Sequence, residues 1–232
     1  MAEIYIIGIN HFDVNGPPRL ERVLDKIKPN LILLEGNEAK VKTRKVYLNL
    51  VVKKLKARKA DDSLIEAILA KGNRLEFESD LVKKFSYYHD TPFIYFNDTV
   101  NNYSSNEVEI EARKYINFIS EKNIKARDIY HELKNVQKDC DRRWNLLKSV
   151  EGTFREEVFI LDSSFSDNKD FVKAYCHERD IIMERVLRDK VSSCSYQKIA
   201  TINGFSHIVK DSIKRTLYSR VEDLNPIRIF LY

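Results

Sequence analysis

Glycine and proline are scarce in this chain of 232 residues, which has six and five of them. So few chain-breaking residues argue against Gly/Ser linkers and low-complexity segments, and we expect one domain covering residues 1–232. The three cysteines, Cys140, Cys176 and Cys194, share no C-x-x-C spacing. Neither a disulfide framework nor a thiolate zinc site is therefore indicated.

The sequence also has no long apolar run: its longest apolar stretches are no longer than a strand. The N-terminus lacks a basic region followed by a long apolar region. We therefore expect no membrane span and no signal peptide, and we predict a cytoplasmic protein.

Several catalytic motifs are also absent from the sequence. Without Gly-x-Ser-x-Gly there is no nucleophile elbow for a serine hydrolase. Without Gly-x-Gly-x-x-Gly or a P-loop, nucleotide chemistry is unsupported.

The net charge of +5 is concentrated in one stretch, residues 40–59, which holds nine Lys or Arg residues and no acidic residue. Such a stretch can bind nucleic acid, but neither aromatic interleaving nor a recognised nucleic-acid motif accompanies these charges. We interpret it as the solvated face of a long surface helix and do not expect nucleic acid as a partner.

The two ends of the chain have an α/β pattern. Ile4–Ile7 and Leu31–Leu34 read as buried strands, and Pro17-Pro18 starts a helix between them that ends near Ile27. This β-α-β unit implies that its two strands are parallel neighbours. The fold class predicted is α/β, with a mostly parallel or mixed sheet flanked by helices.

The middle of the chain, residues 37–150, reads as a mostly helical insertion with one core strand at about 92–97. We expect this insertion to cover the carboxyl ends of the strands. The helices and strands predicted from residue 37 onward are helices 37–60, 61–70 and 76–87, strand 93–96, helices 104–121, 125–150 and 168–190, strand 197–202, helix 206–221 and strand 227–232.

Two copies of the pattern Gly-x-x-His follow apolar strands at opposite ends of the chain: Gly8-Ile9-Asn10-His11 and Gly204-Phe205-Ser206-His207. Two other predicted strands end in a carboxylate, Glu35 and Asp98. Ligands of open α/β sheets bind at the carboxyl edge of the strands. The pattern therefore predicts that two imidazoles and two carboxylates share one crevice there.

The helix predicted over 168–190 contributes Arg179, which stands in the middle of an apolar stripe that includes Tyr175 and Met183. A charge in such a stripe needs a partner or a cavity. Either Arg179 pairs with Glu178 or Asp180, or it serves the predicted site; neighbours in sequence point away from each other on a helix, which favours the site.

In this order, the motifs resemble the TraB/Tiki superfamily, which extends to the pheromone-shutdown proteins, the erythromycin esterases and the ChaN-like haem-binding proteins. The resemblance rests on the two Gly-x-x-His motifs, the strand-end Glu35, the helix motif Glu178-Arg179-Asp180 followed by Met183, and Asp98 after a central strand. It implies a site at the strand ends, formed by His11, Glu35, Arg179 and His207. For Tiki-like members it also implies metal-dependent peptide cleavage.

The leading hypothesis is a metal-dependent hydrolase of peptidase type. His11, Glu35 and His207 would bind a divalent ion, with Asp98 as a further ligand, and the ion would be Mn²⁺, Co²⁺ or Zn²⁺ because imidazole favours that group. The bound ion would lower the pKa of a water molecule, and Arg179 would stabilise the oxyanion.

Two alternatives stay open. In the first, the enzyme is a metal-free esterase-like hydrolase with His11 as general base, Glu35 orienting it and Arg179 stabilising the oxyanion. In the second, the protein is a non-catalytic regulator that captures a peptide or haem. The partner expected is a peptide or a small-molecule substrate, and a homo-oligomer is compatible with the sequence.

Overall fold

A computed structural model describes residues 2–74, 77–96, 104–150, 169–210 and 216–231, apart from the side chains at 143, 146–150 and 169–177. Its centre is a five-stranded sheet in which every pairing is parallel, in the order β3-β2-β4-β1-β5. The strands are β1 (Glu3–Ile9), β2 (Leu31–Leu34), β3 (Phe93–Tyr95), β4 (Lys198–Gly204) and β5 (Ile227–Phe230). The predicted α/β fold class is confirmed, and the sheet is parallel.

One expectation about this sheet was wrong. β1 and β2 are parallel but not neighbours, because β4 lies between them and pairs with both. The reason is burial: β4 is almost wholly buried, so its backbone needs a hydrogen-bonding neighbour on each edge and its two faces need helices. The central place in the sheet therefore goes to a strand from late in the chain.

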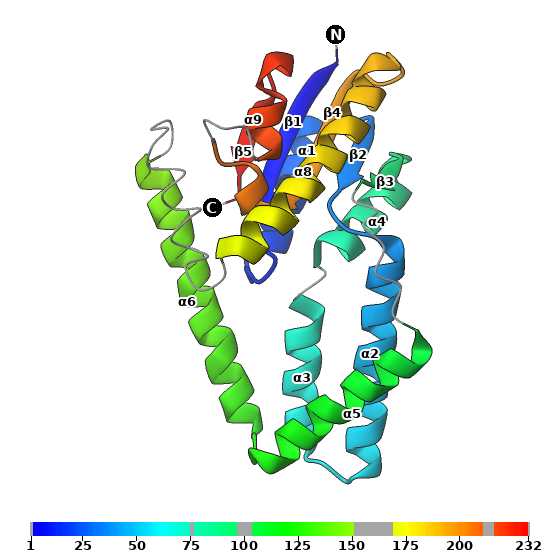
Figure 1. Cartoon of the computed structure of the whole chain (residues 1–232), viewed down its shortest axis with the longest axis vertical. Helices are drawn as coiled ribbons and strands as arrows, with labels where there is room; N and C mark the ends of the chain where they lie inside the picture. The colour runs from blue at the N-terminus through cyan, green and yellow to red at the C-terminus, as the bar shows by residue number, and fades with distance from the viewer. Residues whose placement is uncertain (1, 75–76, 97–103, 151–168, 211–215, 232) are drawn as a thin grey trace.

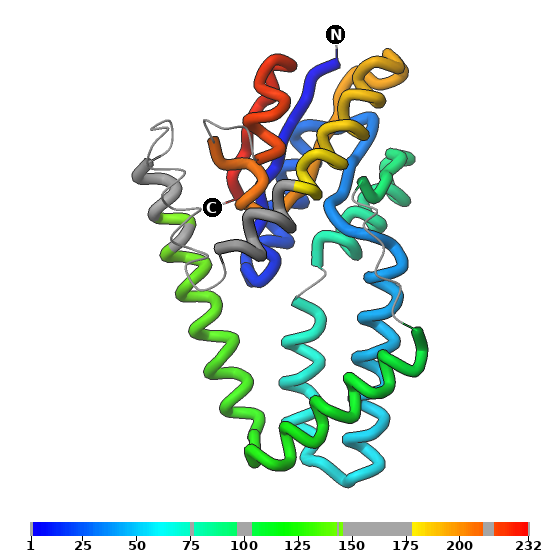
Figure 2. Tube along the Cα trace, viewed as in Figure 1, coloured from blue at the N-terminus to red at the C-terminus, as the bar shows by residue number. Residues whose placement is uncertain are grey.

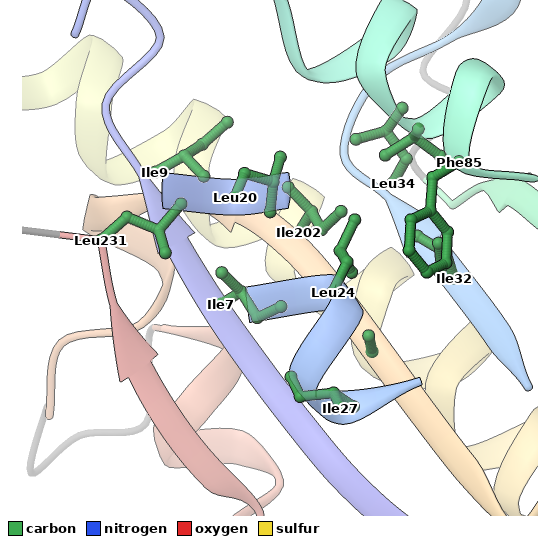
Figure 3. Packing of buried hydrophobic residues seen from close by; sticks show 12 residues of the cluster. Ile7, Ile9, Leu20, Leu24, Ile27, Ile32, Leu34, Phe85, Ile202 and Leu231 are labelled. Carbon is green, nitrogen blue, oxygen red and sulfur yellow. The ribbon is translucent and has the colours of Figure 1, made fainter. Parts of the chain in front are cut away.

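Helices cover both faces of the sheet (Figure 1). On one face, α1 (Gly16–Ile27) and α4 (Phe77–His89) pack on the side chains of Ile7, Ile32 and Ile202. Figure 3 shows this cluster, with Leu20 and Leu24 of α1 and Phe85 of α4 turned toward the strands. On the other face, α8 (Lys169–Ser192) and α9 (Leu217–Arg220) pack on Ile4, Ile6, Leu31, Leu33 and Ile199. Alternate residues of each strand thus serve opposite clusters, as a pleated strand requires.

The remaining helices form an arm that extends away from the sheet: α2 (Glu38–Ala57), α3 (Asp62–Arg74), α5 (Ser105–Glu121) and α6 (Ala126–Val150). Figure 2 shows the chain leaving the sheet along α2 and coming back toward it along α6. The arm has its own apolar cluster, which includes Val51, Ile68, Ile116 and Leu133. The described residues of 37–150 form these four helices, α4 and β3, and the arm packs largely on itself.

A second correction concerns the helix predicted over 206–221. The described part of this segment holds a 3₁₀ turn, Phe205–His207, and then the short helix α9. Thr216 caps α9: its hydroxyl accepts a hydrogen bond from the Ser219 amide and donates one to the Val209 carbonyl at 2.7 Å. That cap begins a new helix and directs the chain back across the sheet.

Buried Asp13, in the loop after β1, connects the arm to the sheet. Its carboxylate accepts hydrogen bonds from Arg19 of α1 (2.8 Å) and from Gln137 and Trp144 of α6 (3.0 and 3.2 Å). The Trp144 ring also packs edge-on against Phe205, with ring centroids 6.1 Å apart. The loops that follow β1 and β4 are thus both held by α6.

We expect Asp13→Ala to lower the free energy of unfolding by about 1.5–3 kcal/mol, because it removes the charged acceptor of the buried Trp144 N–H and of the partly exposed Arg19 and Gln137. Urea denaturation measures the change. Glu111→Ala is the control, because it removes an exposed ion pair with Lys114 and should cost at most about 1 kcal/mol. A loss for Asp13→Ala no larger than that of the control would contradict this account of how α6 is attached.

Candidate functional site

The carboxyl ends of β1, β2 and β4 meet at one edge of the sheet, because neighbouring parallel strands end on the same side. β1 and β4 pair in a register that places Ile9 opposite Gly204. Glu35 directly follows β2, and its amide donates to the Ile202 carbonyl of β4 at 2.8 Å. Three segments far apart in the sequence therefore deliver their polar residues to one place.

Gly204 lies among these polar residues at the edge of the sheet. A Cβ atom on Gly204 would lie 3.2 Å from His11 Nε2, 3.4 Å from Glu35 Oε2 and 3.7 Å from His207 Cδ2. The three side chains that the sequence predicts to converge thus surround a single backbone position. The absence of a side chain at Gly204 leaves the room between them.

Glu35 is the most connected of these residues. Its Oε2 accepts a hydrogen bond from the Gly204 amide at 2.5 Å, and its Oε1 pairs with Arg179 of α8. The same Oε1 lies 3.3 Å from His207 Nε2. Arg179 therefore has a partner from another element, the strand-end Glu35.

Charge and burial act in opposite directions on Arg179. Burial lowers the pKa of its guanidinium, and the negative charge of the adjacent Asp180 partly offsets that effect. The contact with Glu35 is a charge-assisted hydrogen bond, the stronger class of such bonds. Arg179 thus connects α8 to the strand ends.

His207 is held from two sides. Its Nδ1 lies 2.9 Å from Asp180 Oδ1, which also accepts a hydrogen bond from the Leu217 amide at 2.8 Å. Its Nε2 faces Glu35, and only 3% of its side chain is exposed. With both ring nitrogens engaged and almost no exposed surface, His207 is placed to hold Glu35 in position.

His11 has the opposite character, because 36% of its side chain is exposed. Its Nδ1 lies 2.8 Å from Oε1 of Glu78, on α4. Glu78 is itself only 9% exposed, and within the described part of the chain its Oε2 has no hydrogen-bond partner. A carboxylate at Nδ1 favours the tautomer whose Nε2 accepts a proton, and Nε2 is the atom that faces Gly204.

A pocket of about 310 Å³ opens in front of His11. Glu35, Glu78 and Arg179 line it, together with Tyr95 of β3 and residues of the first turns of α2. His207 is not among the lining residues. The structure thus separates the two imidazoles into one that faces the pocket and one behind it.

The described residues do not by themselves form a site for the divalent ion that the sequence predicts. In the described residues, His, Cys, Asp and Glu side chains form no group of three or more that could hold a metal ion. Arg179 already provides the positive charge beside Glu35, and Asp180 engages His207 Nδ1. Asp98 lies outside the described residues. A site for Mn²⁺, Co²⁺ or Zn²⁺ therefore stays a prediction, and no chemical step is assigned to it.

Sequence reasoning missed two acidic residues of the site, Glu78 and Asp180, although a signal for both was present. Glu78 precedes the buried Val82 and Phe85 of α4 by four and seven residues. Asp180 precedes the buried Met183 and Leu187 of α8 by three and seven residues. These spacings place each acid on the buried stripe of its helix, where a carboxylate needs a partner.

None of the described helices combines the length and the hydropathy that a membrane crossing needs. Comparison with known proteins gives no match: no family model, no curated protein and no solved structure matches this chain. The resemblance to the TraB/Tiki superfamily accordingly rests on the motifs alone and remains an expectation.

Proposed function

We propose that this protein is a hydrolase of acyl bonds, esters or peptides, in which His11 is the general base. The observation that carries the proposal is the pair His11–Glu78 at the pocket. One imidazole nitrogen is fixed by a buried carboxylate, and the other faces the space beside Gly204. This is the relation between base and orienting acid that recurs in hydrolases of unrelated folds.

In the proposed reaction, His11 Nε2 takes a proton from a water molecule as the water oxygen attacks the carbonyl carbon of the substrate. Glu78 offsets the positive charge that the imidazole gains. Arg179, which lines the pocket, offsets the negative charge that forms on the carbonyl oxygen. The imidazolium then returns the proton to the leaving alcohol or amine, whose bond to the acyl carbon breaks.

This mechanism differs from the sequence-based alternative in one role. Glu35 was expected to orient His11, but Glu78 Oε1 contacts His11 Nδ1, whereas Glu35 contacts Arg179, His207 and Gly204. We assign Glu35 and His207 the role of holding Arg179 and the Gly204 turn in place. Removing either would disturb the pocket without removing the base.

The first prediction from the proposed function concerns Glu78. We expect Glu78→Gln to lower kcat for a p-nitrophenyl ester by about 10²–10⁴-fold, because the amide cannot offset the charge on the imidazole. His11→Ala should lose at least as much, and the double variant should lose little more than His11→Ala alone. The release of p-nitrophenolate measures turnover, and His131→Ala, at an exposed His on α6, is the matched control.

The same assay separates the metal-free mechanism from the metal-dependent one. Activity that survives a chelator and is lost in His11→Ala and Glu78→Gln supports general-base catalysis by His11. Activity that a chelator removes and Mn²⁺, Co²⁺ or Zn²⁺ restores would replace it with the metal-dependent hydrolase. No turnover on any ester or peptide probe would contradict the proposed function.

The second prediction concerns Gly204. Its backbone, with φ −55° and ψ 144°, suits any residue, so alanine introduces no backbone strain there. The new methyl group would, however, stand between His11 and Glu35. We expect Gly204→Ala to lose at least ~10-fold in kcat/KM because small displacements of reacting groups are costly, while Tm changes by no more than a few degrees.

Gly8→Ala is the contrasting variant. A Cβ on Gly8 would lie 2.1 Å from Ile208 Cδ1 in the core, so overpacking should lower stability by about 1–3 kcal/mol. Thermal unfolding and ester turnover are measured for both variants. Full activity of Gly204→Ala would show that the space beside Gly204 is not where the reaction takes place.

A further inference from the structure

One wall of the pocket is formed by the start of α2, and this wall is cationic. Lys40, Val41 and Arg44 all line the pocket. Residues four apart lie on the same face of a helix, so the ammonium of Lys40 and the guanidinium of Arg44 are neighbours. The lining also contains the carboxylates of Glu35 and Glu78 and the guanidinium of Arg179. The part of the pocket formed by α2 therefore carries positive charge.

The other basic residues of this stretch show what is unusual about Lys40. Lys42 pairs with Glu38 at 2.9 Å, Lys45 with Asp80 at 2.7 Å and Lys54 with Glu109 at 3.4 Å. Within the described parts of the chain, no carboxylate forms an ion pair with Lys40. These pairs lie within α2, between α2 and α4, and between α2 and α5, whereas Lys40 lines the pocket.

Lys40 and Arg44 also repel each other. Partial burial lowers the pKa of the Lys40 ammonium, and the positive charge of Arg44 lowers it further. Like charges four residues apart destabilise a helix by a few tenths of a kcal/mol. An anion placed between the two groups would remove that repulsion and gain a charge-assisted hydrogen bond from each.

The backbone at the start of α2 does not provide this anion site. Asn37 Oδ1 caps the helix and accepts hydrogen bonds from the Ala39 and Lys40 amides, at 2.7 and 3.4 Å. These donors are already used within the chain. Positive charge in the pocket wall therefore comes from the two side chains.

The same two side chains line a second cavity, of about 570 Å³, between α2 and α5. Tyr47, Val108 and Ile110 contribute to its lining. Lys40 and Arg44 accordingly stand between the pocket of His11 and a larger, more apolar cavity. A ligand that enters from either side meets them.

We propose that Lys40 and Arg44 bind an anionic group of the substrate, a carboxylate or a phosphate, on the α2 side of the bond that is hydrolysed. The substrate class is then an acyl compound that carries a negative charge. That the bound anion belongs to a substrate, and that this substrate is hydrolysed, rests on the proposed function. The anion site itself depends only on the two cations. Arg44 lies about 6 Å from Lys40 along the helix axis, which is about one turn of helix. The anionic group would therefore bind between two cations at that separation.

A binding experiment tests the anion site without any turnover. Succinate and inorganic phosphate are titrated by calorimetry into the His11→Ala variant and into the same variant carrying Lys40→Ala and Arg44→Ala. We expect the two added substitutions to weaken binding by about 10–100-fold, roughly tenfold for each lost charged contact. The control carries Lys42→Ala and Lys53→Ala instead, which removes the same net charge from α2 at exposed positions that do not line the pocket.

The comparison of the two anions decides between a carboxylate and a phosphate as the group recognised. Binding that weakens equally in the Lys40/Arg44 variant and in the control would show only a general effect of net charge and would overturn the proposal. Absence of binding of both anions to the His11→Ala protein would overturn it too.

A kinetic experiment then links the site to the reaction. The mono-p-nitrophenyl ester of glutaric acid carries a free carboxylate, and its methyl ester is the neutral counterpart. With Lys40→Ala/Arg44→Ala, we expect kcat/KM to fall by about 10–100-fold for the charged ester and to stay within about twofold for the neutral one. An equal fall for both esters would contradict a role in recognising the anion.

The two proposals can fail separately. If the wild-type chain binds succinate or phosphate through Lys40 and Arg44 but hydrolyses neither ester, the anion site stands and the proposed function fails. If it hydrolyses both esters with the same kcat/KM and the Lys40/Arg44 substitutions change neither value, the proposed function stands and the anion site fails.

Discussion

The parallel pairing of β1 with β4 is the interaction on which the rest of this structure depends. It joins the first strand of the chain to one from near its other end, and its register places Ile9 opposite Gly204. Because both strands run the same way, His11 and His207 emerge at the same edge. β2 pairs with the other side of β4 and adds Glu35 there. Without this pairing, the three polar residues would have no common location.

Around that edge the structure arranges its charged groups in two layers. The inner layer is the chain of contacts Asp180–His207–Glu35–Arg179, whose members are mostly buried and engage one another. Buried charges of this kind are tolerated only when they are paired and hydrogen-bonded. The outer layer, the pair His11–Glu78, lines the pocket together with Glu35 and Arg179 of the inner layer. The inner layer gives rigidity to the turn at Gly204, and the outer layer offers a base that a substrate can reach.

The helical arm contributes to the site in spite of packing largely on itself. α2 begins shortly after the strand-end Glu35 and carries Lys40 and Arg44 along the pocket. α6 returns to hold the loop after β1 through Asp13 and Trp144. Three basic residues of α2 form ion pairs within α2, with α4 and with α5, and Lys40 and Arg44 line the pocket.

From the sequence alone followed the α/β class, the apolar strands, most helix positions and the polar residues at the strand ends, because hydrophobic periodicity and helix caps are local properties. His11, Glu35, Arg179 and His207 were identifiable from their positions after strands or within an apolar stripe. Only the tertiary structure decided that β4 separates β1 from β2, that Arg179 pairs with Glu35, and that His11 faces the pocket while His207 lies behind it. It also brought in Glu78 and Asp180. These are choices of partner between distant segments, and they depend on strand order and helix packing, which no local pattern encodes.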